Sequence, residues 1–262
     1  KLPPVTRWQS WMTYLLDACA VAWISVNNFT TRLFTRIRWQ VSGLETLSLK
    51  DWYLVLANHQ SWADILVLQK VFNHNIPFIK FFLKKELLYV PFLGMCWWAL
   101  DFPFMKRYSK SFLQKNPHLQ GKDIETTRKA CHKFRFKPAA IMNFVEGTRF
   151  TPEKHRQQQS PYRNLLKPKA GGVAFVLGAM GDQLHKILDI TIYYPKGIPS
   201  FWDYISGKVR DITVQIRVLP ITPELLGDYN DSQYRERFQQ WINQLWQHKD
   251  QQLTTLKQGE QQ

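Results

Sequence analysis

The chain has 262 residues and a mass of 31.1 kDa, with 45% apolar and 21% charged residues, so it can form one packed domain and is not generally disordered. No stretch of about 18 residues lacks polar groups, so no transmembrane helix is predicted. Three scattered cysteines exclude a disulfide framework or a zinc site and are expected as reduced thiols in a cytosolic setting.

The net charge of +15 is uneven along the chain. Residues 1–150 hold 21 basic and 9 acidic side chains, and residues 151–262 hold 14 and 11. A basic half predicts an anionic partner: nucleic acid, a lipid headgroup surface or a phosphorylated substrate. The chain begins with Lys1 rather than Met, so we expect a processed chain or a fragment with further residues upstream.

The first 39 residues are typical of a membrane-associating helical segment. Residues 11–26 form an apolar helix candidate interrupted by Asp17, and residues 29–39 form a second, amphipathic one. The second is expected to bury one apolar face in a membrane interface and to place arginines at anionic headgroups. The apolar face comprises Phe29, Leu33 and Ile37, and the basic residues are Arg32, Arg36 and Arg38. The alternative is a helix packed on its own domain with a solvated basic face.

From residue 40 short apolar runs alternate with helical patterns, which predicts an α/β domain over residues 40–257. The expected sheet is mixed but mainly parallel and flanked by helices. Strands are expected at 52–57, 77–82, 100–105, 139–145, 188–194 and 212–219. Helices are expected at 61–73, 121–136, 171–184 and 232–256. The Gln-rich residues 258–262 are expected to be a disordered tail.

The segment NHQSWAD, residues 58–64, follows a predicted strand and opens a predicted helix, where α/β sheets place their sites. His59 can act as a general base near neutral pH, and Asp64 can fix its tautomer if His59 lies in the turn before the helix. Ser61 is then the expected N-cap. The same spacing at His118 and Asp123 lacks a preceding strand, so we interpret that match as coincidence.

The segment FVEGTRF, residues 144–150, ends another predicted strand. Gly147 permits a tight turn, and the guanidinium of Arg149 matches phosphate geometry. Thr148 can donate a hydroxyl hydrogen bond, and Glu146 can accept one from a substrate hydroxyl or hold a basic neighbour. The alternative is a strand-end turn with a surface ion pair.

Together these segments resemble the lysophospholipid acyltransferases, the 1-acylglycerol-3-phosphate acyltransferase superfamily. The likeness covers about residues 40–220 and is closest to a bacterial inner-membrane acyltransferase. Two further blocks support it: KKELLYVPFLG (84–94) followed by Arg107, and Tyr194-Pro195. Phe150 departs from the pattern, because many relatives have a small hydroxyl residue there.

The resemblance implies transfer of an acyl chain from an acyl thioester, acyl-CoA or acyl carrier protein, to the glycerol hydroxyl of lysophosphatidic acid or a related lysophospholipid. His59 would deprotonate that hydroxyl and Asp64 would orient His59. Arg149 would hold the acceptor phosphate, with Glu146, Gly147 and Thr148 around it and Arg107 and Lys85 as weaker candidates. Lys167 and Lys169 would add to the positive field, and the alternative is that they are solvated surface lysines. Backbone N–H groups near Gly147 or residues 91–94 would stabilise the oxyanion.

The resemblance also implies an active site on the cytoplasmic side of the inner membrane and no metal or other cofactor. Three alternatives stay open on the residues. One is a covalent acyl-enzyme on Ser61, Thr148 or Cys96, although no Gly-x-Ser-x-Gly pattern is present. Another is a basic nucleic-acid-binding protein, although no known recognition signature occurs. The third is a membrane-surface scaffold with an inactive site.

Overall fold

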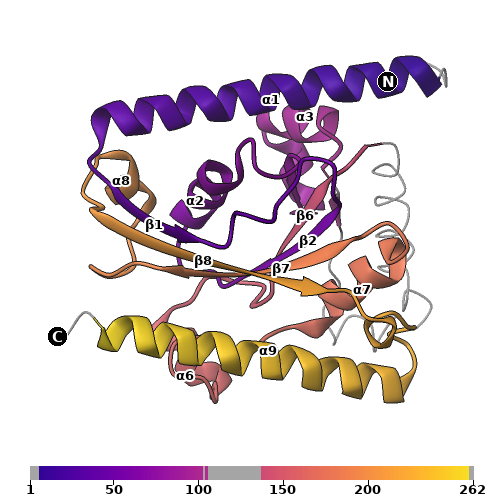
Figure 1. Ribbon diagram of the computed structural model, residues 1–262, viewed down its shortest axis with the longest axis vertical. Helices are drawn as coiled ribbons and strands as arrows, with labels where there is room; N and C mark the ends of the chain where they lie inside the picture. The colour runs from indigo at the N-terminus through magenta and orange to yellow at the C-terminus, as the bar shows by residue number, and fades with distance from the viewer. Residues whose placement is uncertain (1–5, 103, 106–136, 260–262) are drawn as a thin grey trace.

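The computed structural model describes residues 6–102, 104–105 and 137–259. A six-stranded sheet lies between two helical layers, with α1 and α2 on one face and α7 and α9 on the other (Figure 1). The sheet strands are β1 (Arg38–Ser42), β2 (Tyr53–Ala57), β3 (Ile79–Phe81), β6 (Ala140–Phe144), β7 (Lys186–Tyr193) and β8 (Asp211–Pro220). The main helices are α1 (Thr6–Phe34), α2 (Ala63–Phe72), α7 (Ala170–Met180) and α9 (Ser232–Gln258).

The sheet has the order β1-β8-β7-β2-β6-β3, and β7, β2, β6 and β3 run parallel. Strand β8 is antiparallel to β7, and β1 is parallel to β8. The prediction of a mixed, mainly parallel sheet is therefore confirmed. Because the carboxyl ends of β2, β6 and β7 meet at one edge, the segments that follow these strands lie together there.

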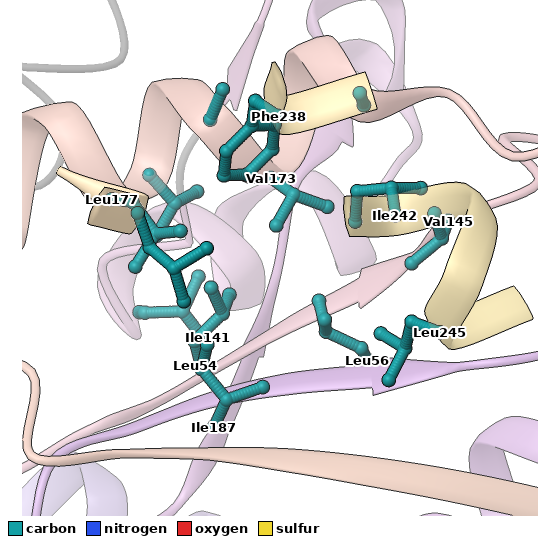
Figure 2. Packing of buried hydrophobic residues seen from close by; sticks show 14 of the residues in the cluster. Leu54, Leu56, Ile141, Val145, Val173, Leu177, Ile187, Phe238, Ile242 and Leu245 are labelled. Atoms are coloured by element: carbon teal, nitrogen blue, oxygen red, sulfur yellow. The ribbon is translucent and has the colours of Figure 1, made fainter. Parts of the chain in front are cut away.

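Strand β2 shows why its sequence is an unbroken apolar run. All five of its residues are buried, and alternate side chains point to opposite faces. Leu54 and Leu56 pack with side chains of α7 and α9, including Val173 and Phe238 (Figure 2). Tyr53 and Val55 pack on the other face with α2. A central parallel strand covered on both faces needs apolar residues at every position.

The N-terminal segment differs from the prediction. The two expected helices form the single helix α1, which ends at Phe34, and residues 38–42 form β1 instead of the end of an amphipathic helix. Arg38 pairs with Asp211 at 2.6 Å, and Ile37 packs against the α2-side core. The expectation that Ile37 and Arg38 continue an amphipathic helix is therefore wrong, because pairing with β8 overrides the local helical period.

Helix α1 packs on the domain through a few inward residues. Asp17 is buried and accepts a hydrogen bond from Lys137 Nζ at 2.8 Å, and Ile24 is buried close to α2. The polar interruption in the apolar run therefore points toward the protein. The outer side of α1 carries exposed apolar side chains, namely Trp11, Leu15, Trp23, Val26, Phe29 and Leu33. Among the described residues, no helix is both long enough and apolar enough to cross a membrane.

Expected strands within the domain are found at 53–57, 79–81, 140–144, 186–193 and 211–220. Expected helices are found at 63–72, 170–180 and 232–258. The expected strand at 100–105 is reduced to β5 (Phe104–Met105), which pairs with β4 (Leu83–Lys84). Gln258, expected to begin the disordered tail, is instead the last residue of α9. The expected helix at 121–136, Arg107 and the His118–Asp123 match lie outside the described residues.

Several short elements have no counterpart in the prediction. They are the 3-10 helices η1 (Lys85–Tyr89) and η4 (Pro223–Leu225) and the helices α3 (Leu93–Ala99), α6 (Pro152–Gln158) and α8 (Phe201–Ile205). Each is seven residues or shorter, so the sequence window contains too few turns for a helical period to be visible.

Candidate active site

The turn between β2 and α2 holds His59 at the carboxyl edge of the sheet. Asn58 anchors the start of this turn, since its side-chain amide donates to the Ile192 carbonyl at 2.9 Å and its Oδ1 accepts from the Ile192 N–H at 2.8 Å. The His59 carbonyl accepts from the Phe150 N–H at 2.7 Å. The backbone on both sides of the imidazole is thus held by neighbouring strands.

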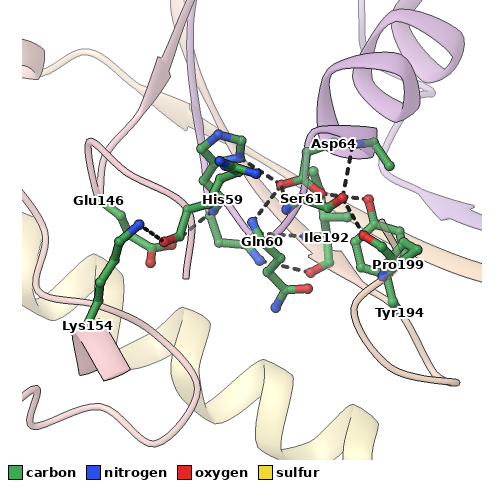
Figure 3. Close-up of polar contacts among 12 residues, drawn as sticks. His59, Gln60, Ser61, Asp64, Glu146, Lys154, Ile192, Tyr194 and Pro199 are labelled. Atoms are coloured by element: carbon green, nitrogen blue, oxygen red, sulfur yellow. Dashed lines mark hydrogen bonds and ion pairs between the residues drawn. The ribbon is translucent and has the colours of Figure 1, made fainter. Parts of the chain in front are cut away.

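The carboxylate of Asp64 is the centre of the site (Figure 3). Its Oδ2 accepts from His59 Nδ1 at 2.9 Å and from the N–H groups of Gln60 and Ser61 at 2.6 and 2.9 Å. Its Oδ1 accepts from the Tyr194 hydroxyl at 2.6 Å. The predicted pairing of His59 with Asp64 is confirmed, with His59 in the turn and Asp64 in the first turn of α2.

This pairing decides the tautomer of His59. A carboxylate only accepts hydrogen bonds, so Nδ1 carries the proton and Nε2 keeps a lone pair. The imidazole stacks on Phe144 with a centroid distance of 3.9 Å and an interplanar angle of 13°. The side chain is 12% exposed. The arrangement can therefore supply a positioned base that a substrate hydroxyl can reach.

Ser61 has a different role from the one expected. The N-cap of α2 is Trp62, whose side chain forms no capping hydrogen bond, so the predicted N-cap Ser61 is wrong by one residue. The Ser61 hydroxyl accepts from the Ala63 N–H at 3.1 Å and donates to the Pro199 carbonyl at 2.5 Å. Within the described part of the chain, no hydrogen bond joins the imidazole of His59 to Ser61, Thr148 or Cys96.

Glu146 contradicts the expectation of a substrate contact. It is completely buried, and its two oxygens accept from the N–H groups of His59 and Leu166, both at 3.0 Å. Burial raises the pKa of Glu146 to about 8, against the lowering effect of these two N–H groups. Glu146 therefore joins the turn after β6 to the turn after β2 from inside the protein, where an acceptor cannot touch it.

The rest of the 146–149 turn is cationic. Gly147 has φ of +68°, a conformation that favours glycine, and a Cβ there would lie 3.3 Å from Lys169 Nζ. Lys154 Nζ donates to the Thr148 hydroxyl at 2.8 Å and to the Arg149 carbonyl at 3.1 Å. The guanidinium of Arg149 lies 4.9 Å from the ring centroid of Trp62, at the start of α2.

Lys154 was missed by the sequence interpretation. It belongs to α6, whose N-cap Thr151 accepts from the Lys154 N–H at 3.2 Å. Thr-Pro-Glu at residues 151–153 is a helix-start signal that could have placed this lysine one turn beyond the Arg149 turn.

The remaining candidates lie elsewhere. Lys85 is exposed at the start of η1, and among the described residues no hydrogen bond or ion pair joins it to the site. Lys167 is exposed, and its N–H donates to Gln158.

The backbone N–H groups expected to stabilise the oxyanion are already occupied at three positions. Those of Leu93, Gly94 and Gly147 donate to carbonyls of nearby residues. In the described ranges, no three His, Cys, Asp or Glu side chains gather to ligate a metal.

A cavity of about 480 Å³ lies away from His59, at the opposite edge of the sheet. Its walls come from α1, the end of α2 and the segments that precede β2, β3 and β6. Tyr14, Asp17, Phe72, His74 and Lys137 line it. None of the residues that contact the His59–Asp64 pair lines this cavity.

The chain is similar to known proteins over more than half of its length. The sequence profile of the acyltransferase family matches residues 38–195, more than half of the chain. A 1-acyl-sn-glycerol-3-phosphate acyltransferase of Arabidopsis thaliana is 29% identical over 66% of this chain and 47% of its own length. The enzyme of that name from Pseudomonas aeruginosa is 27% identical over 85% of this chain and 74% of its own length. The chain spans about half the length of several of its curated relatives.

A solved structure has the same fold. It is the 1-acyl-sn-glycerophosphate acyltransferase PlsC of Thermotoga maritima, with a TM-score of 0.51 and 15% sequence identity. The alignment covers 94% of this chain and 95% of that one. At this identity the likeness demonstrates the fold alone.

The Tyr194 hydrogen bond generates a stability prediction. Tyr194→Phe leaves one oxygen of a buried carboxylate without its donor, so it should lower the free energy of unfolding by about 1.5–3 kcal/mol. Tyr234→Phe is the matched control, because Tyr234 is equally buried and donates at 2.7 Å to the neutral Leu225 carbonyl. That variant should lose only about 0.5–1.5 kcal/mol. Urea unfolding at neutral pH measures both, and equal losses would contradict a charged acceptor.

The buried Glu146 predicts a pH dependence of stability. Folding raises its pKa from 4.5 to about 8, so within this window the native state keeps a proton that the unfolded state has released. The stabilisation that this retained proton provides is complete below the pKa of Glu146 in the unfolded chain. It is lost as the pH rises through the pKa of Glu146 in the folded protein. The free energy of unfolding should fall by up to about 1.4 kcal/mol per pH unit between about pH 5 and pH 8.

Glu146→Gln should remove that slope, since an amide does not titrate. Glu153→Gln, an exposed change on α6, should keep the parent slope. Urea unfolding across the window compares the three proteins. A Glu146→Gln protein with the parent slope would show that Glu146 does not hold the proton.

Proposed function

This chain belongs to the acyltransferase family, and from that membership we propose that it is an O-acyltransferase that acylates the free glycerol hydroxyl of lysophosphatidic acid or a related lysophospholipid. The observation that carries the proposal is the juxtaposition of the His59–Asp64 pair with the cationic turn at 147–149. A base beside an anion-binding surface suits an acceptor that carries both a hydroxyl and a phosphate. The donor is an acyl thioester, acyl-CoA or acyl carrier protein, and no further cofactor is required.

In the proposed reaction His59 works through Nε2. This nitrogen takes the proton of the acceptor hydroxyl while the hydroxyl oxygen attacks the thioester carbonyl carbon, and Asp64 stabilises the imidazolium that forms. Collapse of the tetrahedral intermediate breaks the C–S bond, and His59 returns the proton to the thiolate. The hydrogen bonds that occupy the Ser61 and Thr148 hydroxyls support direct transfer without an acyl-enzyme.

Three cationic side chains are available to the acceptor phosphate. Arg149 is exposed and steadied by Trp62, so its fork is pre-organised for a bidentate contact. Lys154 and Lys169 flank the same turn and add positive potential. In the described part of the chain the N–H groups of Thr148 and Arg149 donate to no acceptor, which makes them our candidates for the oxyanion site.

We further propose that the protein works on a phospholipid membrane, on the cytoplasmic side of the inner membrane. A lysophospholipid acceptor resides in a bilayer, so its hydroxyl must reach His59 from a lipid surface. The exposed apolar side chains along α1 and the exposed Arg32 and Arg36 support docking of this helix in the plane of an anionic leaflet.

The catalytic pair is tested by substitution. His59→Ala should lower kcat by roughly 10²–10⁴-fold with folding retained, because a positioned base contributes about that much. Asp64→Asn should lose a comparable factor by releasing the imidazole. His185→Ala is the matched control, since His185 pairs with Asp51 at 3.0 Å at the other end of the strands. Acyl transfer from a thioester to lysophosphatidic acid, followed by mass spectrometry, measures all three, and near-parent turnover in His59→Ala would refute the mechanism.

The phosphate clamp is tested separately. Arg149→Ala should lower kcat/KM for a phosphorylated acceptor by about 10–100-fold through loss of a charge-assisted hydrogen-bond pair. Arg149→Lys should restore little of this, because an ammonium lacks the planar fork. Arg156→Ala, an exposed arginine change on α6, should leave kcat/KM unchanged. An Arg149→Ala enzyme with parent acceptor kinetics would place the phosphate elsewhere.

A further inference from the structure

The connection between β7 and β8 exposes a compact apolar surface. Within eight residues it carries Ile198, Phe201, Trp202 and Ile205, which we call the α8 surface. Trp202 is 75% exposed, although the strands on either side are largely buried. Large apolar side chains clustered on an otherwise ordered surface mark a contact site.

This surface is held rigidly. Ser200 and Asp203 form a capping box at the start of α8, with the Asp203 N–H donating to the Ser200 hydroxyl at 3.1 Å. Tyr204 is buried and fixes the inner side of the helix against the core. The exposed rings of Phe201 and Trp202 contact each other edge to face, with centroids 5.7 Å apart. A capped and anchored helix therefore presents its aromatic side chains outward.

The charges around the α8 surface are mainly positive. Lys196, Lys208 and Arg210 are exposed in the same connection, and the exposed Arg36 follows the end of α1. Tryptophan flanked by lysine and arginine is the composition of protein surfaces at the boundary between water and lipid. An anionic bilayer matches both the apolar and the cationic parts of this surface.

The surface also lies next to the site and to α1. Its segment begins at Tyr194, which donates to Asp64, and passes Pro199, whose carbonyl accepts from Ser61. At its far end, Gly207 lies close to Phe34 and Thr35, where α1 ends (Figure 1). The α8 surface is therefore continuous with the C-terminal end of the α1 face proposed above to dock on lipid.

We propose that the α8 surface is a second bilayer contact, which seats the carboxyl edge of the sheet, and with it His59, on anionic lipid. This inference rests on the proposed function and adds to it a site distinct from α1. Contact through α1 alone would leave the molecule free to rotate about the axis of that helix. A second contact beside Tyr194 and Pro199 would hold against the leaflet the edge of the sheet from which an acceptor hydroxyl reaches His59.

The test measures partition of the full chain onto vesicles by co-sedimentation, with phosphatidylcholine–phosphatidylglycerol and phosphatidylcholine vesicles compared. Lys196→Glu/Arg210→Glu should weaken binding to the anionic vesicles by roughly twentyfold or more. Trp202→Ser/Ile205→Ser should weaken binding to both vesicle types, by roughly tenfold on the anionic ones. Arg235→Glu/Arg237→Glu on α9 makes the same change in net charge on the other face of the sheet and should bind within about twofold of the parent.

Several results would overturn the inference. They are parent-like binding by both α8 variants, an equal loss in the α9 control, a parent that ignores anionic vesicles, and a dimer in solution that Trp202→Ser/Ile205→Ser dissociates. Acyl transfer by the parent to detergent-dispersed lysophosphatidic acid is measured alongside and judges the chemistry separately. A parent that binds through the α8 surface but transfers no acyl chain would refute the proposed function and still support this contact.

Discussion

Four hydrogen-bond donors converge on the buried carboxylate of Asp64, and the geometry of the whole site depends on that convergence. Such a group is stable away from water only when its lone pairs are occupied, and the donors come from the 59–61 turn and from Tyr194 at the end of β7. One carboxylate therefore sets the shape of a turn, the start of α2 and the tautomer of His59. It also joins chain segments 130 residues apart.

A second set of buried charges supports the sheet from the α9 side. Lys249 is completely buried and lies 2.6 Å from Asp189, and its ammonium also donates to the Ile190 carbonyl. Burial lowers the pKa of Lys249, while Asp189 opposes that shift. This pair ties α9 to the middle of β7, while Glu146 joins the turns after β2 and β6. The second oxygen of Asp189 accepts from Arg217 Nη2 at 2.8 Å, so two cations hold this buried carboxylate.

The layout separates a rigid base from a chemically adaptable surface. His59 is fixed by backbone and side-chain contacts from three strand ends, whereas Arg149 extends from the 147–149 turn on an exposed side chain. Lys154 and Lys169 approach that turn from other segments. A proton-transfer group has to be held to a fraction of an ångström, but an anion can be held by a field of several cations. The α8 surface lies at the same edge, beside the C-terminal end of α1, so an exposed apolar surface adjoins the site there.

Some of this follows from the sequence alone and some only from the tertiary structure. Strand β2, helix α2 and the His59–Asp64 pair were predictable, because apolar runs, helical periods and a five-residue spacing are local properties. The strand at Arg38–Ser42, the burial of Glu146 and the Tyr194–Asp64 hydrogen bond were not predictable. Arg38 pairs with Asp211 across 173 residues, Glu146 meets His59 across 87 and Tyr194 meets Asp64 across 130. Local periodicity contains no information about partners at such separations, so only the assembled sheet decides them.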